Sequence, residues 1–390
     1  MNNEVRKELE KAKKFYKNKQ YCEALDIFEK NYSENPSEFK EWDRIFYSWS
    51  IYQTDVKNPS NEDQLFESAE RVTELIKQVD LNNNSTCPYT FTVFRVLDYL
   101  YKNNDFAYLV KWLDKIDFKL LDSKPSRFNG RLYPSRKEKY FNYSSKAYLE
   151  CKDYEKCIQI SSIALDELDT FTNYNDIWHK WRIAKSLKEL NQSEEALNYL
   201  KEVYLIKQDW FIPKEIAENY FILDDKENAL NYIADAILTD DPVNIKVNLF
   251  YLIYQIFKEE QSELALKHAK LYAAIKINNN VTISSEIEEL LVDNETLDID
   301  LLESEIKEYW LEFRYKNQEL QRGTIRTIFE HGKSGFIKSD DNQLIYFNTR
   351  EFKSDISTLI EGQTVSFYTK KGFNKSKNRE SINAVNINTL

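Results

Sequence analysis

Four short segments near the C-terminus decide how the end of this chain folds. They are Gly323-Thr-Ile-Arg-Thr-Ile-Phe329, Gly332-Lys-Ser-Gly-Phe-Ile-Lys338, Leu344-Ile-Tyr-Phe-Asn348 and Glu361-Gly-Gln-Thr-Val-Ser-Phe-Tyr368. Polar turn sequences separate them, for example Asp340-Asp-Asn342. Short segments that alternate between apolar and polar residues, with turns between them, predict β-strands. The sequence therefore predicts a small all-β module over residues 322–390.

This module resembles the cold-shock domain, a five-stranded barrel of the OB type. Its first surface motif, Lys-Gly-Phe-Gly-Phe-Ile, matches Gly335, Phe336 and Ile337, with Ser334 in place of the first aromatic residue. The second motif, aliphatic-Phe-Val-His-Phe, matches at Ile345 and Tyr346. The remaining positions differ from the family: Phe347 takes an aliphatic position, Asn348 the His, Thr349 the last Phe, and Arg326-Thr327 the Lys-Trp pair of the first strand.

The resemblance implies a module that binds single-stranded RNA or DNA by stacking bases on aromatic rings and holding phosphates with cations. The expected site residues are Phe336 and Tyr346 as stacking rings, Arg326, Lys333, Lys338 and Asn348 around them, and Phe373, Lys371 and Lys375 on the basic loop 370–379. Because several of the family's aromatic residues are missing, the alternative is a barrel that has lost nucleic-acid binding and docks on a protein.

The preceding part of the chain is helical and repetitive. A polar turn followed by Glu-Ala-Leu or a near variant recurs, and its small residue falls at Ala24, Cys157, Ala196, Ala229 and Ala265. A small residue early in a second helix allows its paired helix to approach closely, and large residues one turn later fill the groove. The pattern resembles the tetratricopeptide (TPR) repeat of about 34 residues, best over residues 140–277 and 5–36. It implies a superhelix that holds a protein partner in its groove.

The expected domain order is as follows: partly degenerate TPR-like repeats over 1–120, a basic loop over 121–139, TPR repeats over 140–295, a capping or linker helix over 296–321, and the barrel over 322–390. Between the best-fitting repeats we expect helices at 42–52, 62–79, 89–101 and 106–116, the second of them capped by Ser60 with Asp63. The linker helix is expected over 301–320, with Leu302, Ile306, Trp310 and Phe313 along one face.

The basic loop stands out in an acidic scaffold. It carries Lys124, Arg127, Arg131 and Arg136, together with aromatic residues, and the next helix is expected to start at Ser135, capped with Glu138. The loop is either a second contact for phosphate groups or a solvated insertion whose cations complement the scaffold. The tryptophans of the helices are expected in the core or lining a groove rather than stacking on bases.

Composition supports an acidic scaffold with a basic terminal module. The net charge is −11, yet residues 322–390 carry 11 Lys and Arg against 7 Asp and Glu. The four Cys lack zinc spacing and suit a reducing cytoplasm, and no segment predicts a membrane span. No pattern indicates an enzyme, a cofactor, a metal site or a small-molecule substrate. The whole chain is similar to TPR–cold-shock fusions of bacterial conflict (TOTE-type) operons, which implies a role in defence or RNA surveillance.

Overall fold

The computed structural model describes residues 3–81, 86–260, 262–291, 297–353, 356–374 and 379–390. The chain divides into two compact units, residues 1–190 and residues 191–390. The first unit is helical apart from one small hairpin, and the second combines helices with a β-barrel. None of the helices in the described ranges is both long and apolar enough to cross a membrane.

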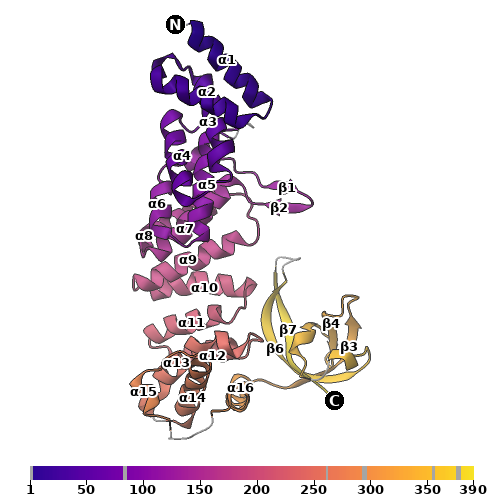
Figure 1. The fold of residues 1–390 in the computed structure, drawn as a ribbon. Helices are drawn as coiled ribbons and strands as arrows, with labels where there is room; N and C mark the ends of the chain where they lie inside the picture. Colours follow the sequence, from indigo (N-terminus) through magenta and orange to yellow (C-terminus); the bar gives the residue numbers. More distant parts are fainter. Residues whose placement is uncertain (1–2, 82–85, 261, 292–296, 354–355, 375–378) are drawn as a thin grey trace. The chain divides into compact units, whose positions relative to one another are not determined.

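The first unit is a stack of helices in which each helix packs on its neighbours in sequence (Figure 1). Alternate helices also contact one another, as α1 with α3 and α7 with α9 do, which is the arrangement of a solenoid built from helix pairs. The helices are α1 (Asn3–Lys17), α2 (Tyr21–Glu34), α3 (Glu41–Ile51), α4 (Glu62–Leu75), α5 (Pro88–Lys102), α6 (Phe106–Leu113), α7 (Arg136–Glu150), α8 (Tyr154–Glu167) and α9 (Asn175–Glu189).

The small residues of the repeat pattern are buried, as the sequence predicts. Ala24, Cys157, Ala196, Ala229 and Ala265 each lie in a helix–helix contact with at most 3 % of their surface exposed. The large residues that follow them are buried as well: Phe28, Leu200 and Ile233 are at most 1 % exposed. The structure therefore confirms a TPR-type helical solenoid followed by a five-stranded barrel.

Several predicted boundaries need correction. Helix α4 ends at Leu75 rather than at residue 79, and its N-cap is Asn61, whose side chain accepts a hydrogen bond from the Gln64 backbone N–H (2.8 Å). The segment expected as a basic loop contains a hairpin, β1 (Ser126–Phe128) and β2 (Arg131–Tyr133). The turn between these strands contains Asn129 and Gly130, which both have positive φ and suit such a turn.

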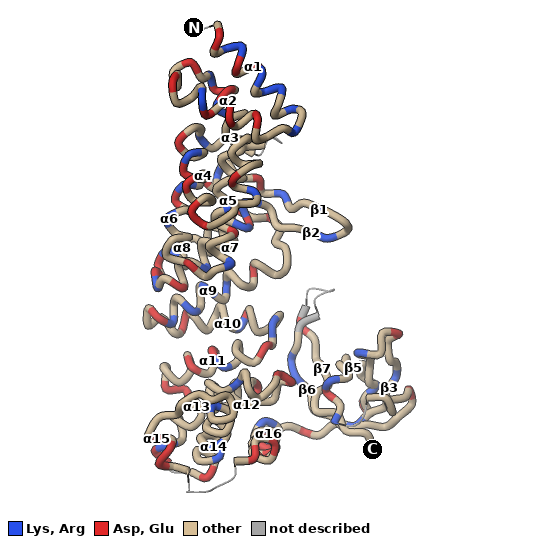
Figure 2. The backbone as a smooth tube through the Cα atoms, viewed as in Figure 1, with Lys and Arg blue, Asp and Glu red and all other residues tan. Residues whose placement is uncertain are grey.

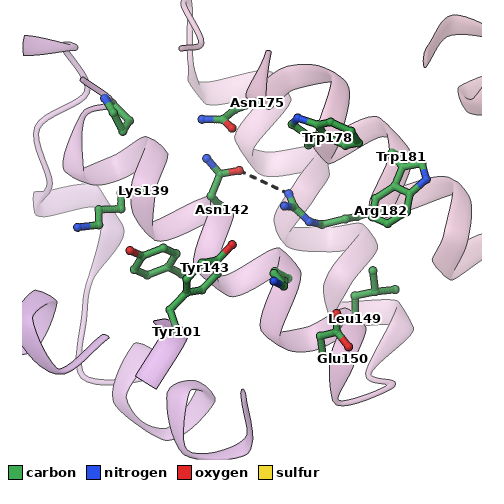
Figure 3. Close-up of a pocket in the computed structure, with 12 residues that line it drawn as sticks. Tyr101, Lys139, Asn142, Tyr143, Leu149, Glu150, Asn175, Trp178, Trp181 and Arg182 are labelled. Carbon is green, nitrogen blue, oxygen red and sulfur yellow. Dashed lines mark hydrogen bonds between the residues drawn. The ribbon is translucent and has the colours of Figure 1, made fainter. Parts of the chain in front are cut away.

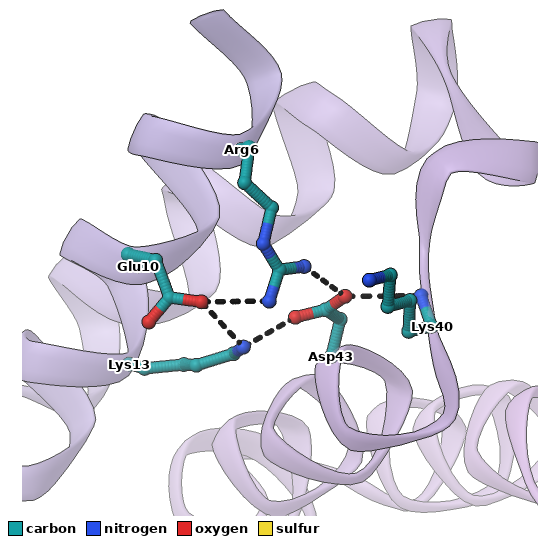
Figure 4. Close-up of polar contacts among 5 residues, drawn as sticks. All are labelled: Arg6, Glu10, Lys13, Lys40 and Asp43. Carbon is teal, nitrogen blue, oxygen red and sulfur yellow. Dashed lines mark hydrogen bonds and ion pairs between the residues drawn. The ribbon is translucent and has the colours of Figure 1, made fainter. Parts of the chain in front are cut away.

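A buried carboxylate ties the first helix to the third (Figure 4). Asp43 on α3 is fully buried and forms ion pairs with Lys13 (2.5 Å) and Arg6 (2.7 Å) of α1, and it also accepts from the Lys40 backbone N–H (3.0 Å). Glu10 bridges the same two cations from the outer side. Burial acts to raise the pKa of Asp43, but the hydrogen bonds from Lys13, Lys40 and Arg6 outweigh it, so the pKa is lowered.

The helices of the second unit, taken by themselves, form helix pairs of the same kind. They are α10 (Ser193–Ile206), α11 (Phe211–Ile222), α12 (Lys226–Ile237), α13 (Val247–Phe257), α14 (Glu263–Asn278), α15 (Ser285–Glu288) and α16 (Ile299–Tyr315). Helix α16 packs on α12 and α14 and buries Ile306 and Trp310, as its sequence pattern predicts. It stops at Tyr315, five residues before the predicted end, and the chain enters the barrel at Gln321.

The C-terminal module is a closed barrel with strand order β3-β4-β5-β7-β6. Its strands are β3 (Gln321–Ile328), β4 (Ser334–Ser339), β5 (Leu344–Asn348), β6 (Thr364–Asn374) and β7 (Arg379–Thr389). Neighbouring strands are antiparallel except for β5 and β7, which are parallel. Inward-facing Ile337, Ile345 and Phe347 help form the core. Gly335 is required there, because a Cβ atom would lie 2.0 Å from the Thr327 carbonyl oxygen.

Candidate nucleic-acid interface

The register between β4 and β5 brings the two predicted stacking residues together. Phe336 lies directly opposite Tyr346, and their ring centroids are 6.0 Å apart in an edge-to-face arrangement. Gly335, Ile337, Ile345 and Phe347 alternate with these two residues and are buried in the barrel. Since successive side chains of a strand point to opposite faces, Phe336 and Tyr346 lie on the outer surface, where both remain partly exposed.

Two further rings extend this pair into a row that the sequence analysis did not identify. Phe329 packs edge-to-face on Phe336 at 5.6 Å, and His331 packs on Phe329 at 5.7 Å. Both lie in the turn that joins β3 to β4, and the Lys333 backbone N–H fixes the imidazole by donating to its Nδ1 (3.1 Å). The only signal in the sequence is their position in the loop before Gly332. We call Phe329, His331, Phe336 and Tyr346 the aromatic row.

Exposed cations surround the aromatic row. Arg326, Lys333 and Lys338 are all exposed, and among the described residues none of the three has a carboxylate within ion-pair distance. The pairing of β3 with β4 shifts between Ile325 and Thr327, so Arg326 is the extra residue of a β-bulge. Bulges redirect a side chain relative to its neighbours. Exposed cations that form no ion pair with the described residues, next to partly exposed aromatic rings, suit the binding of a phosphate-bearing chain.

The other predicted site residues are less clearly placed. The Asn348 side chain accepts a hydrogen bond from the Arg350 backbone N–H (3.0 Å) and thereby caps a short 3₁₀ turn, so its oxygen is already used. Lys371 is exposed on β6. Phe373 lies on β6, but its side chain is not among those described, and Lys375 lies outside the described residues.

Lys370, the first residue of the predicted basic loop, is bound to helices of the second unit. Lys370 on β6 donates to the Tyr204 hydroxyl (2.7 Å) and forms an ion pair with Asp235 of α12 (3.2 Å). Arg314 of α16 binds the same carboxylate oxygen (2.9 Å). Burial acts to raise the pKa of Asp235, but Lys370 and Arg314 lower it overall. Lys370 therefore anchors the barrel to the helices and is not available to phosphates in this arrangement.

The second predicted patch lies on and beside the β1–β2 hairpin of the first unit, which projects from the helices (Figures 1 and 2). Lys124, Arg127 and Arg131 are exposed, and no described residue forms an ion pair with them. Arg136 behaves differently, since it pairs with Asp122 (2.9 Å) and lies over the Phe91 ring (4.5 Å). Ser135 caps α7 by accepting from the Glu138 backbone N–H (3.1 Å), but the helix begins at Arg136 and the Glu138 side chain does not take part in the cap. That carboxylate instead accepts from the Thr172 backbone N–H (2.8 Å), the Thr172 hydroxyl (2.8 Å) and the Asn175 side chain (2.7 Å).

The described residues do not form a metal site. They include no group of three or more His, Cys, Asp and Glu side chains that could hold a metal ion. The two buried histidines are neutral at physiological pH, because burial lowers the pKa of His179 to about 3 and the pKa of His268 to about 4.

No family model matches the chain, and no curated protein matches it. Solved structures resemble it at low identity. A MamA structure is 14 % identical over 60 % of this chain and 95 % of its own, with a TM-score of 0.23. The Cut9–Hcn1 hetero-tetramer of APC/C is 13 % identical over 75 % of this chain and 53 % of its own, with a TM-score of 0.35. A human IFIT1 dimer with m7Gppp-AAAA is 13 % identical over 76 % of this chain and 60 % of its own, with a TM-score of 0.37. Because these TM-scores are low, the fold assignment depends on the helix packing and strand order described above.

Proposed function

We propose that this protein is a non-enzymatic adaptor that binds single-stranded RNA or DNA through its C-terminal barrel and a protein partner through its helical solenoid. The observation that carries the proposal is the aromatic row, with Phe336 opposite Tyr346 and exposed Arg326, Lys333 and Lys338 around it. Aromatic rings stack on bases of any sequence, and each stack contributes about 1–3 kcal/mol.

The likeness of the barrel to the cold-shock domain supports the same proposal, because strands β4 and β5 carry the two matching motifs. The row that the structure assembles has four rings, although only two of them fall at the motif positions. Phe329 and His331 thus replace aromatic surface that the substitutions at Ser334 and Thr349 remove. We place the protein in RNA surveillance or bacterial defence on the resemblance alone.

A groove between α1 and α3 supports the protein-binding half of the proposal. It has a volume of about 320 Å³ and is lined mainly by aromatic side chains. Trp42 at its edge is 67 % exposed and packs on Phe46, which in turn contacts Tyr16 edge-to-face at 5.4 Å. Exposed tryptophan and tyrosine side chains dominate the binding energy of many protein interfaces.

The direct test is fluorescence anisotropy of a labelled 20-nucleotide RNA titrated with the full chain at two salt concentrations. The Phe336→Ala/Tyr346→Ala variant removes two stacking rings, so we expect its Kd to rise by at least about 30-fold. The matched control is Ile356→Ala/Ile360→Ala, which removes two exposed apolar side chains from the loop before β6. Circular dichroism checks that each variant stays folded.

The outcomes separate the two functions that the sequence leaves open. A salt-dependent affinity that falls in the aromatic variant and not in the control supports nucleic-acid binding by the barrel. If the wild-type chain binds no RNA or DNA at low salt, or if both variants bind equally well, the barrel is a docking module. In the first case the protein is a scaffold for protein partners alone, and in the second case nucleic acid binds outside the aromatic row.

A further inference from the structure

The first unit contains a groove that no part of the proposed function uses. It has a volume of about 580 Å³ and lies where α5, α7 and α9 meet (Figure 3). Aromatic rings form much of its lining. Tyr101 and Tyr143 are stacked with centroids 4.2 Å apart, and Trp178 packs edge-to-face on Trp181 at 5.9 Å. A cavity of this size lined by rings and a few polar groups is typical of a ligand site.

The groove also contains a guanidinium, that of Arg182, which forms no ion pair with the described residues. Nη1 of Arg182 donates only to neutral oxygens, those of Asn142 (3.4 Å) and Ser145 (3.2 Å). No carboxylate of the described residues lies within ion-pair distance of it. Burial accordingly lowers the pKa of Arg182. Arg182 is partly buried, and Glu150, which also lines the groove, acts on it without a direct ion pair. Partial desolvation of a cation that lacks a direct ion pair is unfavourable, so an anion that enters the groove would stabilise it.

A second cation lies beside it. Lys146 Nζ is 4.9 Å from the Tyr101 ring centroid and 5.2 Å from that of Phe106, and it has no ion-pair partner among the described residues. Lys139 also lines the groove, paired with Asp98 (2.6 Å). Glu150 is the one carboxylate among the residues that line the groove. The groove is therefore cationic inside a scaffold that is acidic overall.

The β1–β2 hairpin continues this surface along the chain. Pro134, the residue that follows β2, lines the groove. The hairpin exposes 67 % of Phe128 and 44 % of Tyr133, and it carries Arg127 and Arg131, with which no residue in the described ranges forms an ion pair. Exposed rings alternating with exposed guanidinium groups extend the pattern that lines the groove.

We propose that the groove and the hairpin form a second binding site for single-stranded nucleic acid, separate from the barrel. The cations of both elements would hold phosphates, and the exposed rings would stack on bases. An acidic peptide would form ion pairs with Arg182 and Lys146. It would offer no flat groups to stack on the rings of Phe128, Tyr133 and Trp178, whereas nucleic-acid bases would. Because this site contains no residue of the barrel, it can be confirmed or refuted independently of nucleic-acid binding by the barrel.

The experiment uses the full chain and a fluorescein-labelled oligouridylate of 20 nucleotides, measured between 50 and 300 mM salt. Every variant is made in the Phe336→Ala/Tyr346→Ala background as well as in the wild type. The test variants are Arg182→Met/Lys146→Met in the groove and Arg127→Ser/Arg131→Ser on the hairpin. The control Lys7→Met/Lys14→Met removes the same charge from exposed positions of α1.

We expect RNA binding to persist in the barrel variant and to weaken at least tenfold further in each test variant. Each pair of lost phosphate contacts should reduce the slope of log Kd against log salt by about 1.4, since single strands give about 0.7 per contact. The control should change the affinity less than twofold. The hairpin variant keeps the test valid if the groove variant fails to fold, because its side chains are exposed.

Two results would overturn the proposal. The first is that the test variants bind RNA with the same affinity and the same salt slope as the control variant, both in the wild type and in the Phe336→Ala/Tyr346→Ala background. The other is a barrel variant that binds no RNA at 50 mM salt, which would leave the barrel as the sole site. A labelled decamer of glutamate that binds the wild type but not Arg182→Met/Lys146→Met, while RNA affinity is unchanged, would assign the groove to acidic peptides instead.

Discussion

Acid should destabilise the second unit through one buried histidine. His268 on α14 is fully buried, its Nδ1 lies 2.7 Å from the Leu264 carbonyl oxygen, and its Nε2 accepts a hydrogen bond from the Trp310 indole N–H of α16 (3.1 Å). These two contacts fix the neutral tautomer with the proton on Nδ1. A protonated ring would carry a hydrogen on Nε2 pointing at the indole N–H, so protonation breaks the link between α14 and α16.

The size of this destabilisation follows from the difference between the pKa of His268 in the folded chain and in the unfolded chain. Burial lowers the pKa of His268 from 6.5 to about 4. Above pH 6.5 the ring is neutral in both the folded and the unfolded chain, so it adds no pH dependence. As the pH falls below 6.5 the unfolded chain binds the proton first, and the free energy of unfolding decreases until about pH 4. At pH 4.5 the loss amounts to about 2.5 kcal/mol.

The assay is urea unfolding at pH 7.5 and pH 4.5, with His268→Gln compared to the parent. Both proteins carry His179→Gln, because burial also lowers the pKa of His179 and would add a second contribution of the same sign. At pH 7.5 we expect His268→Gln to be less stable by about 1 kcal/mol, since a buried hydrogen bond is weakened. At pH 4.5 it should be the more stable protein by about 1.5 kcal/mol. A stability difference that is equal at both pH values would refute the reasoning.

Two further perturbations test the first unit. Lys152, in the turn between α7 and α8, has a left-handed backbone (φ 61°) and an exposed side chain, so Lys152→Gly should stabilise the unit by about 0.5–1 kcal/mol and raise the Tm by about 1–4 °C. Replacing Asn104 (φ 57°) by Gly should increase the free energy of unfolding by less, because Asn tolerates the left-handed conformation better than Lys does. Asp43→Asn should destabilise the unit by about 3 kcal/mol, measured by urea unfolding at pH 7, because it leaves the largely buried Lys13 without its main counter-charge. A loss below about 1 kcal/mol would show that Glu10 alone compensates Lys13.

The sequence predicts the fold well because its signals are local. The buried small residues of the repeats recur at intervals set by the helix pair, and the strand alternation and turn sequences of the barrel lie within a few residues of each other. The start of α7 is equally local, and the helix begins at Arg136, next to the predicted Ser135. The misplaced ends of α4 and α16 are errors of the same kind, because a helix end depends on contacts that the periodicity does not record.

The candidate site is only partly local. Phe336 and Tyr346 can be paired from strand alternation and a short turn, whereas Phe329 and His331 join the row only because the β3–β4 turn folds back over β4. The sequence treats every cation of a basic segment alike. The structure instead shows that Arg136 is neutralised by Asp122, while Arg127 has no ion-pair partner among the described residues.

What the sequence determines by itself is therefore the class of each part, a helical repeat and a five-stranded barrel, because hydrophobic periodicity and turn residues are properties of neighbouring positions. What the tertiary structure alone decides is which charges remain available. Lys370 donates to Tyr204, 166 positions away, while Arg182 donates to the neutral oxygens of Asn142 and Ser145 and forms no ion pair within the part of the chain that the structure describes. Charge pairing acts between side chains that are distant in sequence and close in space, so no local pattern encodes it.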